Sequence, residues 1–257
     1  MSIFEYNKEE EEQKLRKAEY EAGVEMGKFF ADKGIKTAAI YGAFIPNPMH
    51  VYRTAGVLAG LGLSYGGATT EEDVVGLIFA DQGIDLSKIS GDIKIVSYLQ
   101  GYGDTTTDEI NAAIQAAPEA FISVGMATTF FTQQLNAAGI EFSDIDSFTK
   151  SNGEAITNGK LVYLAGKYSS SVGPAFALVM NAINGNVIRD AQGNAVSLSQ
   201  NYQVATDSET FDKFYKNDNG DNPIYSRDTL DQIIGDTVTF DTCLLYTSDA
   251  ADDTPCV

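Results

Sequence analysis

The chain has 257 residues, of which 44% are hydrophobic, and its formal net charge at pH 7 is −19. This size predicts one large domain or two modest ones. The excess of acidic residues argues against a nucleic-acid partner, because phosphate contacts require clusters of Lys and Arg. No apolar run approaches the length of a membrane span, and Met1 leads into an acidic segment rather than into a signal peptide.

Apolar residues recur along the chain at helical and at strand spacings. In the first helical segment, Leu15, Ala18, Ala22 and Met26 follow one another at steps of three and four and form one apolar face. Short apolar runs that are bounded by Gly, Pro or polar residues predict strands. We expect helices at residues 7–33, 49–61, 71–80, 108–116, 127–138, 172–183, 208–216 and 227–235. We expect strands at residues 36–41, 93–99, 120–124, 144–148, 160–165 and 202–206, a helical turn at 154–158 and a polar hairpin at 186–199.

The segment 117–139 shows the repeating unit most clearly. A proline and the apolar run 120–124 are followed by Gly125, which breaks the run, and then by a helical pattern that ends at Gly139. Strands that alternate with helices in this way predict an α/β fold, namely an open, mainly parallel sheet with helices on both faces. In such sheets ligands bind beyond the carboxyl ends of the strands.

This rule selects the first candidate ligand-binding residues. Gly125, Met126, Thr128 and Thr129 follow the strand at 120–124, and the hydroxyl of Thr128 or Thr129 together with the backbone amides at the helix start could hold a small molecule. In the loop after the strand at 93–99, Tyr102 and Asp104 could stack on and bind a sugar ring, although aromatic residues at strand ends also belong to cores.

Four stretches resemble, in order and spacing, the type 1 periplasmic solute-binding proteins, a family that includes the ribose- and galactose-binding proteins. They are residues 20–34 (YEAGVEMGKFFADKG), 52–56 (YRTAG), 117–139 and 156–173. The resemblance covers about residues 18–185. It implies two lobes around a cleft that closes on a ligand by a hinge motion.

The resemblance also implies a division of the chain. Residues 1–165 correspond to the second lobe of such a protein, and residues 166–242 to the hinge crossover and the segment that returns to the first lobe, most of which is missing. We therefore expect the apolar faces of the 172–183 helix and the 202–206 strand to lack their natural cover. Residues 243–257 (CLLYTSDAADDTPCV) resemble the translation of a sequencing adapter, and we expect them to be a non-native tail that carries both cysteines.

The family's site residues transfer only in part. Arg53 matches an arginine that reaches sugar hydroxyls, and its alternative role is that of a surface arginine paired with a nearby acid. The segment Gly125–Thr128 stands where the family often has an Asn-Asp pair, so the usual polar clamp is weakened. Thr149 falls near the family's cleft aspartate, with Asp146 close by, and Lys167 falls near a hinge residue that contacts the ligand.

The resemblance implies the solute-binding component of an ABC importer, which captures a sugar or a similar small polar solute outside the cytoplasm and delivers it to a membrane permease. No cofactor, metal or catalytic activity is expected, since no metal-ligand spacing occurs and a single histidine, His50, gives no Ser-His-acid set. The alternative is the effector-sensing domain of a sugar-responsive transcriptional regulator, which shares this fold.

Overall fold

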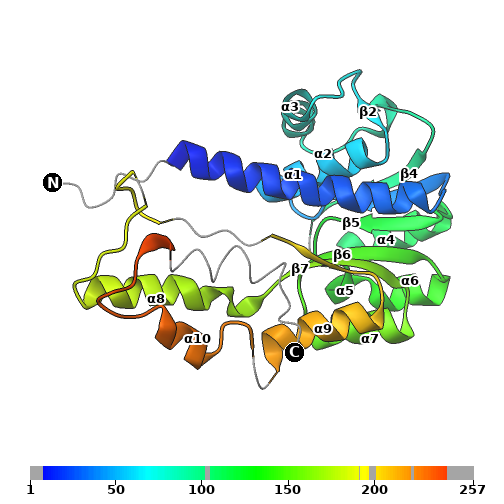
Figure 1. The fold of residues 1–257 in the computed structure, drawn as a ribbon. Coiled ribbons are helices and arrows are strands. Elements are labelled where there is room, and N and C mark those ends of the chain that lie inside the picture. Colours follow the sequence, from blue (N-terminus) through cyan, green and yellow to red (C-terminus); the bar gives the residue numbers. More distant parts are fainter. Residues whose placement is uncertain (1–7, 102–104, 191, 197–200, 221–222, 242–257) are drawn as a thin grey trace.

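The computed structural model describes residues 8–101, 105–190, 192–196, 201–220 and 223–241 (Figure 1). Its helices are α1 (Lys8–Asp32), α2 (Pro48–Gly60), α3 (Glu71–Asp81), α4 (Thr105–Gln115), α5 (Ala127–Phe130), α6 (Thr132–Ala138), α7 (Lys150–Asn158), α8 (Val172–Ile183), α9 (Ser208–Asn219) and α10 (Arg227–Gln232), with 3-10 turns η1 (Leu86–Lys88) and η2 (Ser169–Ser171). Its strands are β1 (Thr37–Tyr41), β2 (Ser64–Tyr65), β3 (Ile89–Ser90), β4 (Lys94–Leu99), β5 (Ala120–Ser123), β6 (Glu141–Ser147), β7 (Leu161–Lys167) and β8 (Gln203–Ala205). No helix within these residues is both long and apolar enough to cross a membrane.

Six strands form one sheet in the order β4-β1-β5-β6-β7-β8. All neighbours are parallel except β7 and β8, which pair antiparallel. The strand order reverses direction after β4, and right-handed crossovers therefore place α1 and α2 on one face of the sheet and α4, α6 and α7 on the other. The central strands β1 and β5 are buried almost throughout, as strands covered on both faces must be. The predicted fold class is confirmed.

Helices α1 and α2 touch through their backbones. Gly23 and Gly27 of α1 face Gly56 and Gly60 of α2, and a Cβ atom built at Gly56 would lie 2.1 Å from the carbonyl oxygen of Tyr20. A side chain at any of these positions would therefore push the helices apart. The close approach brings the side chains that follow along each helix into contact, among them the pair described below.

Several predicted elements differ from the observed ones. The single helix expected at 127–138 is divided into α5 and α6 at Phe131, which leaves helical geometry because its ring is buried against Tyr41 and Phe121. The helical turn expected at 154–158 is the complete helix α7. The short antiparallel ribbon of β2 and β3 was not predicted, because two residues per strand leave no periodic signal.

After β7 the chain leaves the sheet. We call residues 168–201 the excursion; within it, η2 and α8 run away from the sheet. Helix α10, which follows β8 and α9 in the sequence, packs against α8 (Figure 1). The side chain of Asn181 fixes this packing, since it donates to the carbonyl oxygen of Ile233 and accepts from the amide of Gly235, both at 2.8 Å. Of the hairpin expected at 186–199, the described residues show only a bridge between Arg189 and Ala195.

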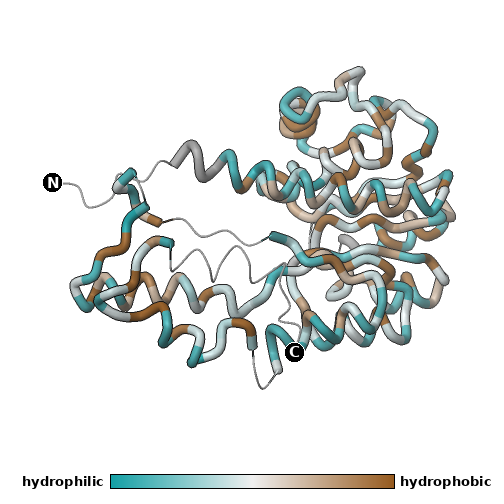
Figure 2. The backbone as a smooth tube through the Cα atoms, in the orientation of Figure 1, coloured by the Kyte–Doolittle hydropathy of each residue, from teal (hydrophilic) through white to brown (hydrophobic). Residues whose placement is uncertain are grey.

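The returning strand β8 lies in the same sheet as β7, and α9 packs on β8 and α7. The division of the chain at residue 166 stays a prediction, while β8 and α9 lie beside strands and helices of residues 1–165. The physical reason is the antiparallel ladder from Gly166–Gln203 to Leu164–Ala205, which satisfies the backbone hydrogen-bonding groups at the edge of β7. By contrast, α8 exposes a row of apolar residues, visible as brown segments of the tube in Figure 2.

Candidate functional site

The carboxyl ends of β1, β5, β6 and β7 meet at one edge of the sheet, because these strands are parallel neighbours. We call the loops at this edge the rim. Most of the predicted site residues for which the structure gives a position lie at the rim, in the first two turns of the adjoining helix or at the end of a strand: Arg53, Gly125, Met126, Thr128, Thr149 and Lys167. Asp146 lies in β6 opposite Gly166. Tyr102 and Asp104 lie outside the described residues.

Two large apolar side chains are exposed at the rim. Phe44, in the loop after β1, is 47% exposed, and Met126, in the turn after β5, is 43% exposed. The two turns lie against each other, because a Cβ atom built at Gly125 would be 2.6 Å from the Cβ atom of Ala43. Gly125 therefore permits the close approach of the two turns. Phe44 and Met126 are thus exposed on turns whose backbones pack against each other.

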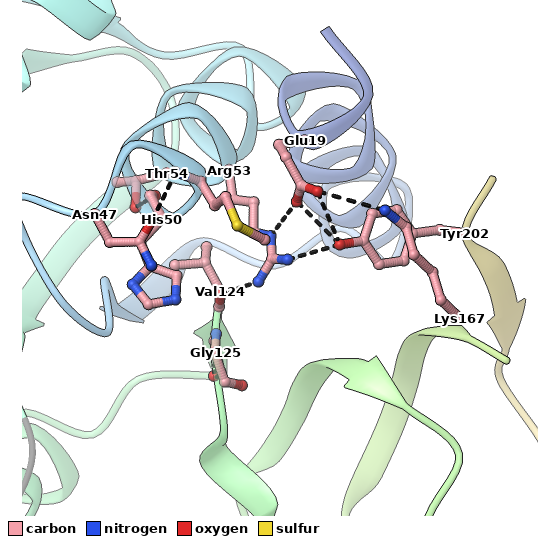
Figure 3. Close-up of polar contacts among 11 residues, drawn as sticks. Glu19, Asn47, His50, Arg53, Thr54, Val124, Gly125, Lys167 and Tyr202 are labelled. Carbon is pink, nitrogen blue, oxygen red and sulfur yellow. Dashed lines mark hydrogen bonds and ion pairs between the residues drawn. The ribbon is translucent and has the colours of Figure 1, made fainter. Parts of the chain in front are cut away.

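Arg53 is buried rather than exposed at the rim. Its side chain is 1% exposed, and it ion-pairs through Nε with Oε2 of Glu19 at 2.6 Å (Figure 3). Its two terminal nitrogens donate to the carbonyl oxygen of Val124 at 3.0 Å and to the hydroxyl of Tyr202 at 2.6 Å. The pairing with an acid was the alternative role considered for Arg53, but the pair lies in the interior and not on the surface. Through Val124, Arg53 holds the end of β5 and so the turn that carries Met126.

Lys167 joins the same cluster from the end of β7. Its Nζ lies 3.5 Å from Oε1 of Glu19 and 4.2 Å from the centre of the Tyr202 ring, over which it stacks. The Tyr202 hydroxyl donates to Glu19, with Oε2 at 2.9 Å. We call Glu19, Arg53, Lys167 and Tyr202 the Glu19 cluster. The sequence prediction missed Glu19 and Tyr202, although Glu19 stands four residues after Leu15 on the apolar face of α1, where an acid requires a partner.

The amides at the start of α5 are already bonded within the chain. The buried carboxylate of Asp144 accepts from the amides of Ala127 and Thr128, each at 3.0 Å. Our expectation that these amides could hold a ligand therefore does not fit their observed partners. The hydroxyl of Thr128 is enclosed and has no hydrogen-bond partner within the described residues. Asp144 was not predicted, although an acid in the middle of an otherwise buried strand is a sign of such a role.

Other turns at the rim are capped in the same way. Asn47 accepts from the amide of Met49 at the start of α2, and Thr149 accepts from the amide of Asn152 at the start of α7. After β7, the carboxylate of Asp218 accepts from the amides of Ser169 and Ser170 at 2.9 and 2.8 Å. These helix and turn amides are thus satisfied by the chain, which leaves them unsuited to an anion.

Burial raises the pKa of Tyr168, which follows β7, so its phenol is neutral at physiological pH. Within the described residues, no group of three or more His, Cys, Asp or Glu side chains is placed to hold a metal ion.

Comparison with known proteins identifies the architecture. No protein-family model matches the chain. No curated protein matches it either. Among solved structures, the periplasmic binding protein of the arabinose ABC transporter from Shewanella sp. ANA-3, bound to L-arabinofuranose, matches with a TM-score of 0.50 and 17% identity over 78% of this chain and 61% of its own.

Two further structures show the same pattern. An ABC transporter periplasmic solute-binding protein from Actinobacillus succinogenes, with bound D-allose, gives a TM-score of 0.49 and 16% identity over 76% of this chain and 61% of its own. An arabinose-binding protein from Geobacillus stearothermophilus gives 0.47 and 14% over 77% of this chain and 63% of its own. The chain thus spans about three fifths of the length of these proteins. Its mainly parallel six-stranded α/β fold matches that of periplasmic binding proteins.

Proposed function

We propose that this chain is the solute-binding component of an ABC importer and that it holds a small, uncharged, polyhydroxylated solute such as a sugar at the rim. The observation that carries the proposal is the pair of exposed apolar side chains, Phe44 and Met126, on neighbouring turns at the carboxyl edge of the sheet. A sugar offers an apolar C–H face that packs on such side chains, and its hydroxyls bind the polar groups around them.

The capping pattern supports an uncharged solute. A carboxylate or phosphate is usually held by free amides at a helix start or by an unpaired cation. At the rim, the amides after β5 and β7 bind Asp144 and Asp218, and Lys167 lies beside Glu19. An anionic solute would have to displace these internal carboxylates, whereas a neutral one would not.

The proposal also includes a second lobe. The face of α8 that points away from α10 exposes Val172, Phe176, Val179 and Ile183. We propose that this face packs in the complete protein against a lobe that faces the rim, so that the solute is enclosed between two lobes. The protein would act outside the cytoplasm, carry out no chemistry and pass its solute to a membrane permease. The fold of the solved sugar-binding structures supports this proposal by analogy.

An NMR titration of the purified chain tests the proposal, because it detects binding that is weakened when only one lobe contacts the solute. Uncharged pentoses and hexoses, including L-arabinose and D-allose, are added to the ¹⁵N-labelled chain, and gluconate serves as the anionic control. We expect at least one neutral sugar to shift the amide signals of Gly125, Met126 and Thr149, and gluconate to leave them unchanged. Shifts confined to residues away from the rim, or no shift with any neutral sugar, would contradict the proposal.

A further inference from the structure

The excursion begins and ends at two residues of the Glu19 cluster. Lys167 is the last residue of β7, where the chain leaves the sheet, and Tyr202 immediately precedes β8, where the chain returns. Both side chains reach the same carboxylate, that of Glu19 in α1, which is 1% exposed. Two positions that are 35 residues apart in the sequence are therefore fixed to a single buried group (202 − 167 = 35).

The carboxylate is itself held firmly. Arg53 pairs with it at 2.6 Å and is equally buried, and the backbones of α1 and α2 touch beside this pair through Gly23, which lies against the carbonyl of Arg53. In a site shielded from water, such charged hydrogen bonds are stronger than on a surface, and losing one partner leaves an uncompensated polar group. The cluster is therefore anchored where the backbones of α1 and α2 touch.

The Tyr202 hydroxyl is the link between this anchor and the returning chain. It accepts from a terminal nitrogen of Arg53 at 2.6 Å and donates to Glu19 at 2.9 Å, while its ring lies under the Lys167 ammonium group (Figure 3). The outgoing and returning segments thus contact each other as well as the lobe. A phenol in this position has one donor and one acceptor role, and both are filled.

We propose that the Glu19 cluster is a clamp that fixes both ends of the excursion to the lobe, with Tyr202 as the residue that closes it. Releasing Tyr202 frees the edge strand β8 and the end of β7 while the rest of the sheet stays folded. The clamp sets the direction in which α8 leaves the lobe, and it requires no bound solute. Arg53 and Lys167 then act as positioning residues that orient the rim and the crossover.

Hydrogen exchange of the full chain, followed by mass spectrometry, tests the clamp with two matched variants. Tyr202→Phe removes the hydroxyl that bonds Arg53 and Glu19. Tyr163→Phe is the control, because Tyr163 is also a tyrosine of this lobe, but its buried hydroxyl has no hydrogen-bond partner within the described residues. The amides of 203–205 and 164–166, which pair β8 with β7, report on the clamp, and those of 37–41 and 120–123 report on the central sheet.

We expect Tyr202→Phe to raise exchange at the β7–β8 pairing by roughly tenfold and to leave β1 and β5 unchanged, since hydrogen bonds to charged groups are among the stronger ones. Tyr163→Phe should match the wild type at every segment. Glu19→Gln, which keeps the shape and removes the charge, should reproduce the segment pattern of Tyr202→Phe. The clamp is overturned if Tyr202→Phe leaves 203–205 unchanged, or if it raises exchange equally in β1 and β5. Neither outcome depends on solute binding, so failure of the clamp and failure of the proposed function are distinguishable.

Discussion

The lobe, meaning the sheet and the helices packed on it, and the excursion differ in how far their apolar helix surfaces are buried. In the lobe, α2 buries Val51, Val57 and Leu58 against α1 and the sheet. In the excursion, α8 carries no charged residue, yet Val172 is 70% exposed and Ile183 is 71% exposed. The difference shows that an apolar sequence determines a helix but not its burial, because burial requires a surface on the opposite side.

The largest expected contrast comes from removing one aromatic ring in each region. Phe121 of β5 is fully buried against Phe131, and Phe176 of α8 is 53% exposed. Phe121→Ala should lower the free energy of unfolding by about 3–5 kcal/mol, because it leaves a cavity in the core. Phe176→Ala should change it by less than about 1 kcal/mol, because most of the ring is already in water. Urea denaturation measures both, and equal losses would mean that α8 is covered in solution.

Removing an arginine from the lobe and one from α10, the helix that packs against α8, should give the second contrast. Arg53→Ala leaves the Glu19 carboxylate buried without its main partner and should cost about 3 kcal/mol or more. Arg227→Ala in α10 removes a pair with Asp231 in which both side chains are mostly exposed, and it should cost less than about 0.5 kcal/mol. The same denaturation experiment compares them. A small loss for Arg53→Ala would show that the buried pair is not needed for stability.

Adding a methyl group to one glycine in each region should give the smallest contrast. Gly56→Ala places a Cβ atom against backbone, the Tyr20 carbonyl, and should cost about 1–3 kcal/mol because two helices must separate. At Gly173 in α8 the new atom would meet a side-chain methyl of Leu230 at 3.0 Å, and that side chain can move. Gly173→Ala should therefore stay within about 0.5 kcal/mol of the wild type, as a favourable helix propensity offsets a minor repacking. Thermal unfolding of the two variants checks which loses more stability, and a larger fall in melting temperature for Gly173→Ala than for Gly56→Ala would contradict the prediction.

The sequence by itself determined the α/β class and the order of the main helices and strands. Strand and helix periodicities are local patterns, which can be recognised without knowing which segments pack together. It also indicated which strand ends form the rim, since parallel strands align their carboxyl ends. The exposed Met126 lies where this rule placed it.

Only the tertiary structure decided what the polar residues do there. Arg53 meets Glu19 because glycines let α1 and α2 touch, and Tyr202 reaches both because β8 returns beside β7. The carboxylate of Asp144 accepts hydrogen bonds from the two amides that the sequence analysis had assigned to a ligand. Such pairings join residues that are 16 to 183 positions apart, and their energies depend on burial and geometry that no local period encodes.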